Sequence, residues 1–285
     1  MASPMVTSRL KTYASFIKLE HTIFSLPLIV SGALLHLRRW PNAKLAALIL
    51  LAASAGRILA MGFNRIIDAK IDARNLRTKQ RELPRGAMRV REAWAIVLVA
   101  WLLYAVSAAA IAPICLALSP IPVGLFVIYP YLKRFTSLAH LGLGLAWSMA
   151  PLGGWLAASK SLAAIGEVGW LWLFSVLWVC GFDIIYATMD EAFDRAAGLY
   201  SLPAQWGRKP ALRIAAALHA LALLALCALW QSQLRSPRAL IWLIGIGALF
   251  IWQHSIAERK PEFAFFQLNG VLGFFVFGLV LAGMR

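Results

Sequence analysis

Long apolar runs alternate with short polar connections along the whole chain. The runs fall at residues 21–37, 44–67, 93–112, 114–130, 138–158, 168–189, 211–230, 238–254 and 263–283. About 20 apolar residues are needed for an α-helix to cross the ~30 Å hydrocarbon core of a bilayer. The pattern therefore predicts an all-α integral membrane protein, a bundle of about nine transmembrane helices. The third and fourth runs are split only at Ala112 and Pro113, which predicts a tight hairpin there.

Composition agrees with this class, because 61% of the residues are hydrophobic and only 14% are charged. The polar stretch Met1–Lys18 lacks the pattern of a cleaved signal peptide, so we expect the first run to be retained as a span. No composition shift marks a separate soluble domain. We therefore expect one domain over residues 1–285, with membrane lipids as its surroundings.

The net charge of +16 would suggest nucleic acid as a partner in a soluble chain. Here most basic residues fall in the connections between apolar runs, where they set topology and meet anionic headgroups. We expect no nucleic-acid partner. The N-terminus and the connections that lie on the same side of the membrane, after the second, fourth, sixth and eighth spans, carry most of the Lys and Arg residues. This places the N-terminus in the cytoplasm and the C-terminus outside, in what we expect to be a bacterial inner membrane.

A first acidic segment, residues 64–72, ends the second apolar run. Asn64, Asp68 and Asp72 are spaced four apart. A helix advances 100° per residue, so their side chains share one face.

A second acidic segment, residues 183–194, ends the sixth run. Read as one helix, it places Asp183, Tyr186, Asp190 and Asp194 on one face. The two segments hold every aspartate of the chain, and the predicted topology places both on the cytoplasmic side. Each is followed by a Leu-Pro step and a glycine, which suggests an internal repeat over about 15–135 and 138–283.

Ionisable groups at a membrane boundary are costly unless they face the interior of the bundle and serve a purpose. Carboxylates that converge there repel each other unless cations compensate them. Oxygen ligands suit Mg²⁺, which is commonly held by one or two carboxylates together with substrate phosphates. The sequence therefore predicts two metal-bearing walls with a diphosphate between them.

Basic residues next to these walls fit an anionic substrate. Residues 70–91 form a basic connection that includes Arg74, and Lys133 and Arg134 close the fourth run. Cations near a metal-bound phosphate would stabilise a leaving diphosphate. For any one residue of the connection, a purely topological role is an equal alternative.

Arg57 lies inside the second run, on the face of Asn64. A lone arginine at that depth needs an anionic or carbonyl partner. We expect an organic anion such as an aromatic carboxylate, with a packing contact to a backbone carbonyl or to Glu20 as the alternative. His21, at the start of the first run, is a second candidate for the same acceptor, although a structural role is the alternative.

These motifs resemble the UbiA superfamily of intramembrane prenyltransferases. The likeness is carried by Asn64-Arg-x-x-Asp68-x-x-x-Asp72, Asp183-x-x-Tyr186-Ala-x-x-Asp190-x-x-x-Asp194 and Tyr129-x-x-x-Lys133-Arg134, and it runs from about Phe16 to the last span. Within the superfamily, residues 20–27 and 61–75 look most like enzymes labelled 4-hydroxybenzoate polyprenyltransferase. They are also similar to enzymes that prenylate a dihydroxynaphthoate on a menaquinone route.

The resemblance implies a helical bundle around a central cavity, with a polar cap of loops on the cytoplasmic side. It also implies Mg²⁺-dependent transfer of a polyprenyl group from an allylic polyprenyl diphosphate to a small aromatic acid in quinone biosynthesis. By matching position, one set of residues would hold the metal and the diphosphate: Asn64, Asp68, Asp72, Asp183, Tyr186, Asp190 and Asp194. Lys133, Arg134 and Arg74 would bind phosphate.

A divalent-cation or solute transporter is the alternative from another class, because its carboxylates would also face inward in two repeats. A transporter would place its acidic residues near the midplane of the membrane, with access from both sides. This chain places its acids near one interface beside a basic connection, which favours an anionic substrate. A scaffold or quinone-binding role is a further alternative. Within the enzyme class, haem farnesylation, chlorophyll esterification and ether-lipid synthesis stay open, and Arg57 favours an acidic aromatic acceptor over these.

Overall fold

A computed structural model describes residues 4–17 and 22–284, and these residues form helices joined by turns and loops. The first half comprises α1 (Pro4–Ile17), α2 (Thr22–Leu37), α3 (Ala43–Asp72), α4 (Val90–Ile111), α5 (Pro113–Leu118), α6 (Pro120–Leu132) and α7 (Ala139–Ser159). The second half comprises α8 (Gly166–Ala187), α9 (Glu191–Ala197), α10 (Leu202–Trp206), α11 (Arg208–Leu229), the π-helical turn η2 (Trp230–Leu234), α12 (Pro237–Ile256) and α13 (Pro261–Gly283).

Eight segments of the described chain are long and apolar enough to cross a bilayer, with α5 and α6 together forming one of them. The apolar part of α2, Ser25–Leu37, is shorter. With α2 included, these segments correspond one to one to the predicted spans. Large apolar side chains on α4 and α12, such as Leu98 and Ile241, are exposed on the outside of the bundle, as expected for a surface that faces lipid.

Local sequence sets where the helices begin. Pro113, Pro120, Pro237 and Pro261 each occupy the first turn of a helix, where the missing N–H costs nothing. Ala112 is extended and separates α4 from α5, which confirms the predicted break. The side chain of Asn42 caps α3 by accepting a hydrogen bond from the Leu45 N–H at 2.9 Å.

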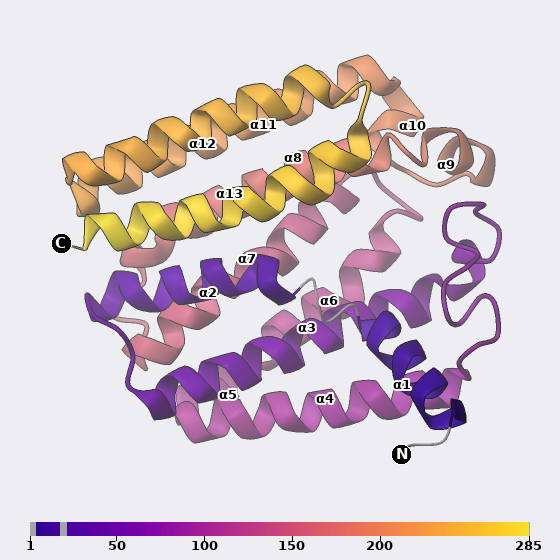
Figure 1. Ribbon diagram of the computed structural model, residues 1–285, viewed down its shortest axis with the longest axis horizontal. Coiled ribbons are helices and arrows are strands. Elements are labelled where there is room, and N and C mark those ends of the chain that lie inside the picture. The colour runs from indigo at the N-terminus through magenta and orange to yellow at the C-terminus, as the bar shows by residue number, and fades with distance from the viewer. Residues whose placement is uncertain (1–3, 18–21, 285) are drawn as a thin grey trace.

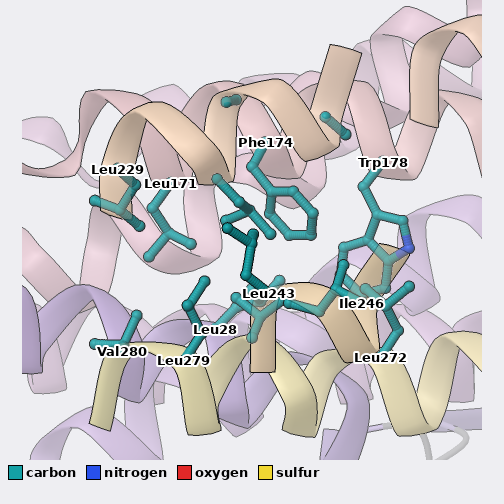
Figure 2. Close-up of a cluster of buried hydrophobic side chains, with 14 of the residues drawn as sticks. Leu28, Leu171, Phe174, Trp178, Leu229, Leu243, Ile246, Leu272, Leu279 and Val280 are labelled. Atoms are coloured by element: carbon teal, nitrogen blue, oxygen red, sulfur yellow. The ribbon is translucent and has the colours of Figure 1, made fainter. Parts of the chain in front are cut away.

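The main core lies among α2, α8, α11, α12 and α13. Figure 2 shows Phe174 and Trp178 of α8 directed toward Leu28, Ile246 and Leu272 from the facing helices. Elsewhere, glycines allow backbones to touch: a Cβ added at Gly32 of α2 would lie 2.0 Å from a backbone oxygen of α7. Such close approach is characteristic of helix pairs within a membrane.

The polar connections gather at one end of the bundle. Figure 1 shows α9, α10 and the connection between α3 and α4 on the right-hand side, with the C-terminus at the opposite end. We call α9, α10 and residues 73–89 the cap. The first acidic segment is the last part of α3, and the second begins at the end of α8. Both therefore reach the same end of the molecule.

Candidate active site

A cavity of about 860 Å³ opens between the helices below the cap. Its cap end is polar and contains both acidic segments. Its deeper part is lined by apolar residues from several helices, including Ile49 of α3, Ile111 of α4 and Leu156 of α7. The cavity therefore joins a charged chamber to an apolar one within the bundle.

The first acidic segment lies on one face of α3, as predicted. Asp68 and Asp72 are 2% and 5% exposed, and both line the cavity with Asn64. The Asn64 Nδ2 group donates to Asp68 Oδ2 at 3.3 Å. The continuous helix keeps these three side chains in register.

The second acidic segment is not one helix, so the predicted single face is wrong. The helix α8 ends at Ala187, and Asp190 lies in the turn before α9. Hydrogen bonds end the helix here: the Thr188 hydroxyl donates to the Ile185 carbonyl, and Arg208 Nη2 donates to the Thr188 carbonyl at 2.9 Å. These partners satisfy carbonyls that a continuing helix would use.

Despite the break, the side chains of the second acidic segment line the same cavity as the first. They are Asp183, Tyr186, Asp190 and Asp194. The end of α8 supplies the first pair, and the turn and α9 supply the second. The predicted meeting of the two acidic segments is present in the structure.

Basic side chains hold three of the carboxylates. Lys133 Nζ lies 2.5 Å from Asp68 Oδ2. Arg81 Nη1 donates to both oxygens of Asp72, at 2.9 and 2.7 Å. Arg77 pairs with Asp190. Each carboxylate is more deeply buried than its cation, so the cations lie toward the more open part of the site.

The connection after α3 ties the two acidic segments together. Asn75 Nδ2 donates to Asp190 Oδ1 at 2.8 Å, and Arg77 Nη1 donates to the Tyr186 hydroxyl at 2.5 Å. Burial alone would lower the pKa of Arg77, but the hydrogen bonds with Asp190 and Tyr186 raise that pKa above its ordinary value. Arg77 is therefore a permanent cation of the site.

The two remaining carboxylates have neutral or titratable partners. His140 Nδ1 lies 2.6 Å from Asp183 Oδ2, and the His140 Nε2 atom accepts the Leu202 N–H at 3.2 Å. Nδ1 therefore carries the proton that faces Asp183. Burial raises the pKa of the Asp194 carboxyl above its usual range, and a hydrogen bond with Ser201 offsets part of that effect.

Arg57 lies in the apolar part of α3, where its guanidinium carbon is 4.9 Å from the centroid of the Trp147 ring. It lines the cavity, as expected for a ligand contact. Its Nε atom is buried and has no hydrogen-bond partner in the described part of the chain. Glu20, the alternative partner, lies outside the described residues, and so does His21.

Two predicted phosphate contacts do not line the cavity. Arg74 is exposed in the first turn after α3 and is not part of the cavity lining. Arg134 donates to the Ile67 carbonyl at 2.7 Å and lies 3.7 Å from Asp68 Oδ1. Arg134 therefore binds the backbone of α3 and adds a positive charge near Asp68.

Sequence reasoning missed several residues of the chamber. Arg77 and Arg81 were visible only as members of a basic connection, and His140 as a lone histidine in an apolar run. Glu82, which is 4% exposed, accepts the Ser15 hydroxyl at 2.6 Å and lies 3.8 Å from Arg65. An intramembrane arginine at position 65 was the signal for this buried pair, because such a charge needs a partner.

The donor set fits a hard divalent cation. Carboxylate oxygens from both acidic segments face the cavity, and Asp68 Oδ1 is buried without a hydrogen-bond partner in residues 4–17 and 22–284. In the described ranges, no three His, Cys, Asp or Glu side chains converge on one point. Mg²⁺ binds oxygen ligands and is usually held by one or two carboxylates and completed by waters and substrate phosphates.

A helical membrane bundle with acidic segments and cations above an apolar chamber is typical of an enzyme that acts on an amphiphilic anion. The model of the UbiA prenyltransferase family matches residues 25–281, and the chain belongs to this family. It is a prenyltransferase, and it is an integral membrane protein.

Two relatives show the extent of the likeness. The 4-hydroxybenzoate octaprenyltransferase of Vibrio atlanticus (strain LGP32) is 29% identical over 266 residues, covering 92% of this chain and 93% of the relative. The 4-hydroxybenzoate octaprenyltransferase of Coxiella burnetii (strain CbuK_Q154) is 30% identical over 278 residues, covering 95% and 92%.

Solved structures share the fold. The apo structure of a UbiA homolog from Aeropyrum pernix K1 is 36% identical, with a TM-score of 0.83, and covers 93% of this chain and 97% of that chain. A UbiA homolog from Archaeoglobus fulgidus, solved bound to GPP and Mg²⁺, has a TM-score of 0.70 at 20% identity and covers 95% and 99%. At that identity the comparison establishes the fold alone.

Proposed function

We propose that this prenyltransferase moves a polyprenyl group from an allylic polyprenyl diphosphate to an aromatic acid of the 4-hydroxybenzoate type, in quinone biosynthesis. The observation that carries the proposal is the meeting of two acidic segments and their cations above an apolar chamber. The chamber suits an isoprenoid tail, and the charged end suits a diphosphate. The names of the relatives from Vibrio and Coxiella support this donor and acceptor.

Mg²⁺ is the proposed metal. Asp68, Asp72, Asp190 and Asp194, with Asn64, would hold it against the diphosphate. When bound, the metal would neutralise charge on the diphosphate as it leaves. The homolog from Archaeoglobus fulgidus with GPP and Mg²⁺ supports this assignment. The contact of Asp183 with His140 gives Asp183 a supporting position beside this group.

The cations of the cap would bind the phosphate oxygens. Lys133, Arg77 and Arg81 already lie against the carboxylates, and Tyr186 adds a hydroxyl. Charge-assisted hydrogen bonds from these groups would take up the negative charge that develops as the carbon–oxygen bond of the allylic diphosphate breaks. They would then keep the leaving group away from the reacting carbon.

The apolar part of the cavity protects the reaction. An allylic cation is quenched by water, and the apolar lining, which includes Ile49, Ile111 and Leu156, would keep water away from it. An electron-rich ring carbon beside the phenol hydroxyl would attack the allylic carbon. The ring proton would then pass to a nearby base or to water.

Arg57 would bind the carboxylate of the acceptor, with His21 as a further predicted contact. A dihydroxynaphthoate of menaquinone biosynthesis carries the same carboxylate and is the alternative acceptor.

Transport of a divalent cation or a solute is less well supported than prenyl transfer, because the acidic side chains gather at one end of the bundle. We also propose one domain over 1–285, with the repeat about 15–135 and 138–283 as a hypothesis.

The proposed orientation follows the basic residues. The cap carries Arg77, Arg81 and further Lys and Arg residues, which favours a cytoplasmic position. The C-terminus, at the opposite end of the bundle, would lie outside. A bacterial inner membrane is the proposed location.

The test uses membranes that contain the full chain, radiolabelled geranyl diphosphate, Mg²⁺ and a panel of aromatic acids that includes 4-hydroxybenzoate and a dihydroxynaphthoate. We expect one acid to become lipid-extractable and labelled, and the product to disappear when EDTA removes the metal. Membranes with Asp68→Asn provide the matched control. Labelling of none of the acids, or labelling that persists in EDTA, would contradict the proposal.

A further inference from the structure

Two buried N–H donors in the cavity wall have no hydrogen-bond partner among the described residues, and their side chains are in contact. One is Arg57 Nε on α3, and the other is Trp147 Nε1 on α7. The guanidinium carbon of Arg57 is 4.9 Å from the centroid of the Trp147 ring. Among the described residues, no carboxylate forms an ion pair with Arg57. A buried donor left without an acceptor costs free energy, so this pair indicates a ligand that supplies acceptors.

Ring contacts fix the orientation of both donors. Phe182 contacts the Trp147 ring edge to face, with centroids 5.9 Å apart and planes at 84°. Arg57 covers the same ring, so its guanidinium is held by the cation–π contact. Neither the guanidinium nor the indole N–H can accept a hydrogen bond, so the missing group must be an acceptor. Next to a permanent cation, an anionic acceptor is favoured.

The depth of this pair separates it from the diphosphate end. Arg57 precedes Asn64 by seven residues and Asp68 by eleven, which corresponds to roughly 10 Å and 16 Å along the axis of α3. Arg57, Asn64 and Asp68 all line the same cavity. An anion bound at Arg57 is therefore distinct from the diphosphate. The molecule that carries it can still approach the diphosphate, because both lie in one cavity.

We propose that Trp147 is a specificity-determining residue whose Nε1–H donates, together with Arg57, to the carboxylate of the aromatic acceptor. This inference rests on the proposed function and extends it. Arg57 supplies a positive charge and the N–H donors of its guanidinium. The oxygens of a carboxylate have enough lone pairs to accept from both residues. Trp147 thereby adds a donor that favours acids over neutral phenols of the same size.

The experiment compares Trp147→Phe, which keeps an aromatic ring under Arg57 but removes the N–H, with the wild-type full chain in detergent. Dissociation constants for 4-hydroxybenzoate and for 4-hydroxybenzamide are measured by calorimetry, and KM is measured for geranyl diphosphate. We expect the variant to bind the acid about tenfold more weakly, with the amide and geranyl diphosphate changed by no more than about twofold. Trp170→Phe, on the exposed side of α8 and outside the cavity lining, is the matched control.

The outcomes separate this inference from the proposed function. If the wild type transfers to the acid but Trp147→Phe binds it as tightly, the inference fails and the function stands. An equal loss for acid and amide would show that Trp147 does not discriminate between them, which also overturns the inference. If the wild type neither binds nor prenylates any aromatic acid, both fail. Thermal unfolding of the variant in detergent confirms that it is folded.

Discussion

The acidic segment 64–72 stays on one helix, whereas the segment 183–194 crosses the end of α8, a turn and the start of α9. In the first, the register of α3 places the carboxylates on one face, and Lys133 and Arg81 pair with them. In the second, contacts from elsewhere hold the carboxylates: Asn75 and Arg77 hold Asp190, and His140 holds Asp183. The carboxylates of the first wall therefore lie on one helix, whereas the Asp190 part of the second wall is held by the cap.

The connection 73–89 contacts both acidic segments, and its cations are also candidates for binding the diphosphate. Its side chains reach the second acidic segment through Arg77 and the first through Arg81. A diphosphate that enters between the walls would meet the same cations that hold the walls in place. Under the proposed function, the cap would therefore link substrate binding to the geometry of the carboxylates.

Removal of one carboxylate from either wall should have the largest effect. Asp68→Asn and Asp190→Asn each keep the shape of the side chain and remove its charge. We expect each to lower kcat for Mg²⁺-dependent prenyl transfer by at least about 10²-fold, because metal and diphosphate need both walls. Radiolabelled transfer in membranes measures this, and normal activity in either variant would remove that wall from the metal site.

A change in Arg77 should affect the second wall more than the first. Arg77→Gln removes the ion pair with Asp190 and the hydrogen bond to Tyr186. We expect kcat/KM for geranyl diphosphate to fall about 10- to 100-fold, because an orienting partner and a phosphate donor are lost together. Steady-state kinetics at saturating acceptor test it, and an unchanged kcat/KM would show that the second wall is held without Arg77.

Arg57 lies outside both walls and should act on the acceptor alone. We expect Arg57→Ala to raise KM for the aromatic acid by about tenfold or more, and KM for geranyl diphosphate by much less, because a charged hydrogen bond is lost only to the acid. The measurement is the pair of KM values. The opposite order would refute the carboxylate role of Arg57.

A change in Arg74 should have the smallest effect on kinetics, and it is the matched control for the change in Arg77. It belongs to the same connection but is exposed outside the cavity. We expect Arg74→Gln to change kcat/KM for geranyl diphosphate by no more than about twofold, since an exposed charge contributes little. A loss comparable to that of Arg77→Gln would mean that the charge of the whole connection matters rather than the contacts of Arg77.

Much of the fold could be predicted, because spacing alone determines it. Apolar length located the spans, Ala112 and Pro113 marked the break between α4 and α5, and the four-residue spacing of Asn64, Asp68 and Asp72 placed them on one face. The end of α8 could not be predicted, because it depends on Arg208, twenty residues away, which binds the Thr188 carbonyl.

The choice among basic residues was also beyond the sequence. Arg74, Arg77 and Arg81 are alike in type and lie within eight residues of one another. Only the path of the connection after α3 decides that Arg77 and Arg81 enter the chamber and Arg74 does not. His140 was missed for the same reason, since its partner Asp183 lies 43 residues away.

The most direct test of the central claim is metal-dependent binding of geranyl diphosphate, measured by calorimetry with the full chain in detergent. The wild type should bind geranyl diphosphate in the presence of Mg²⁺ and only weakly in EDTA. Asp68→Asn and Asp190→Asn should each abolish the difference between these two conditions, because both walls share one metal-bridged diphosphate. If either variant keeps the wild-type affinity and the wild-type dependence on Mg²⁺, the two acidic segments do not form one site.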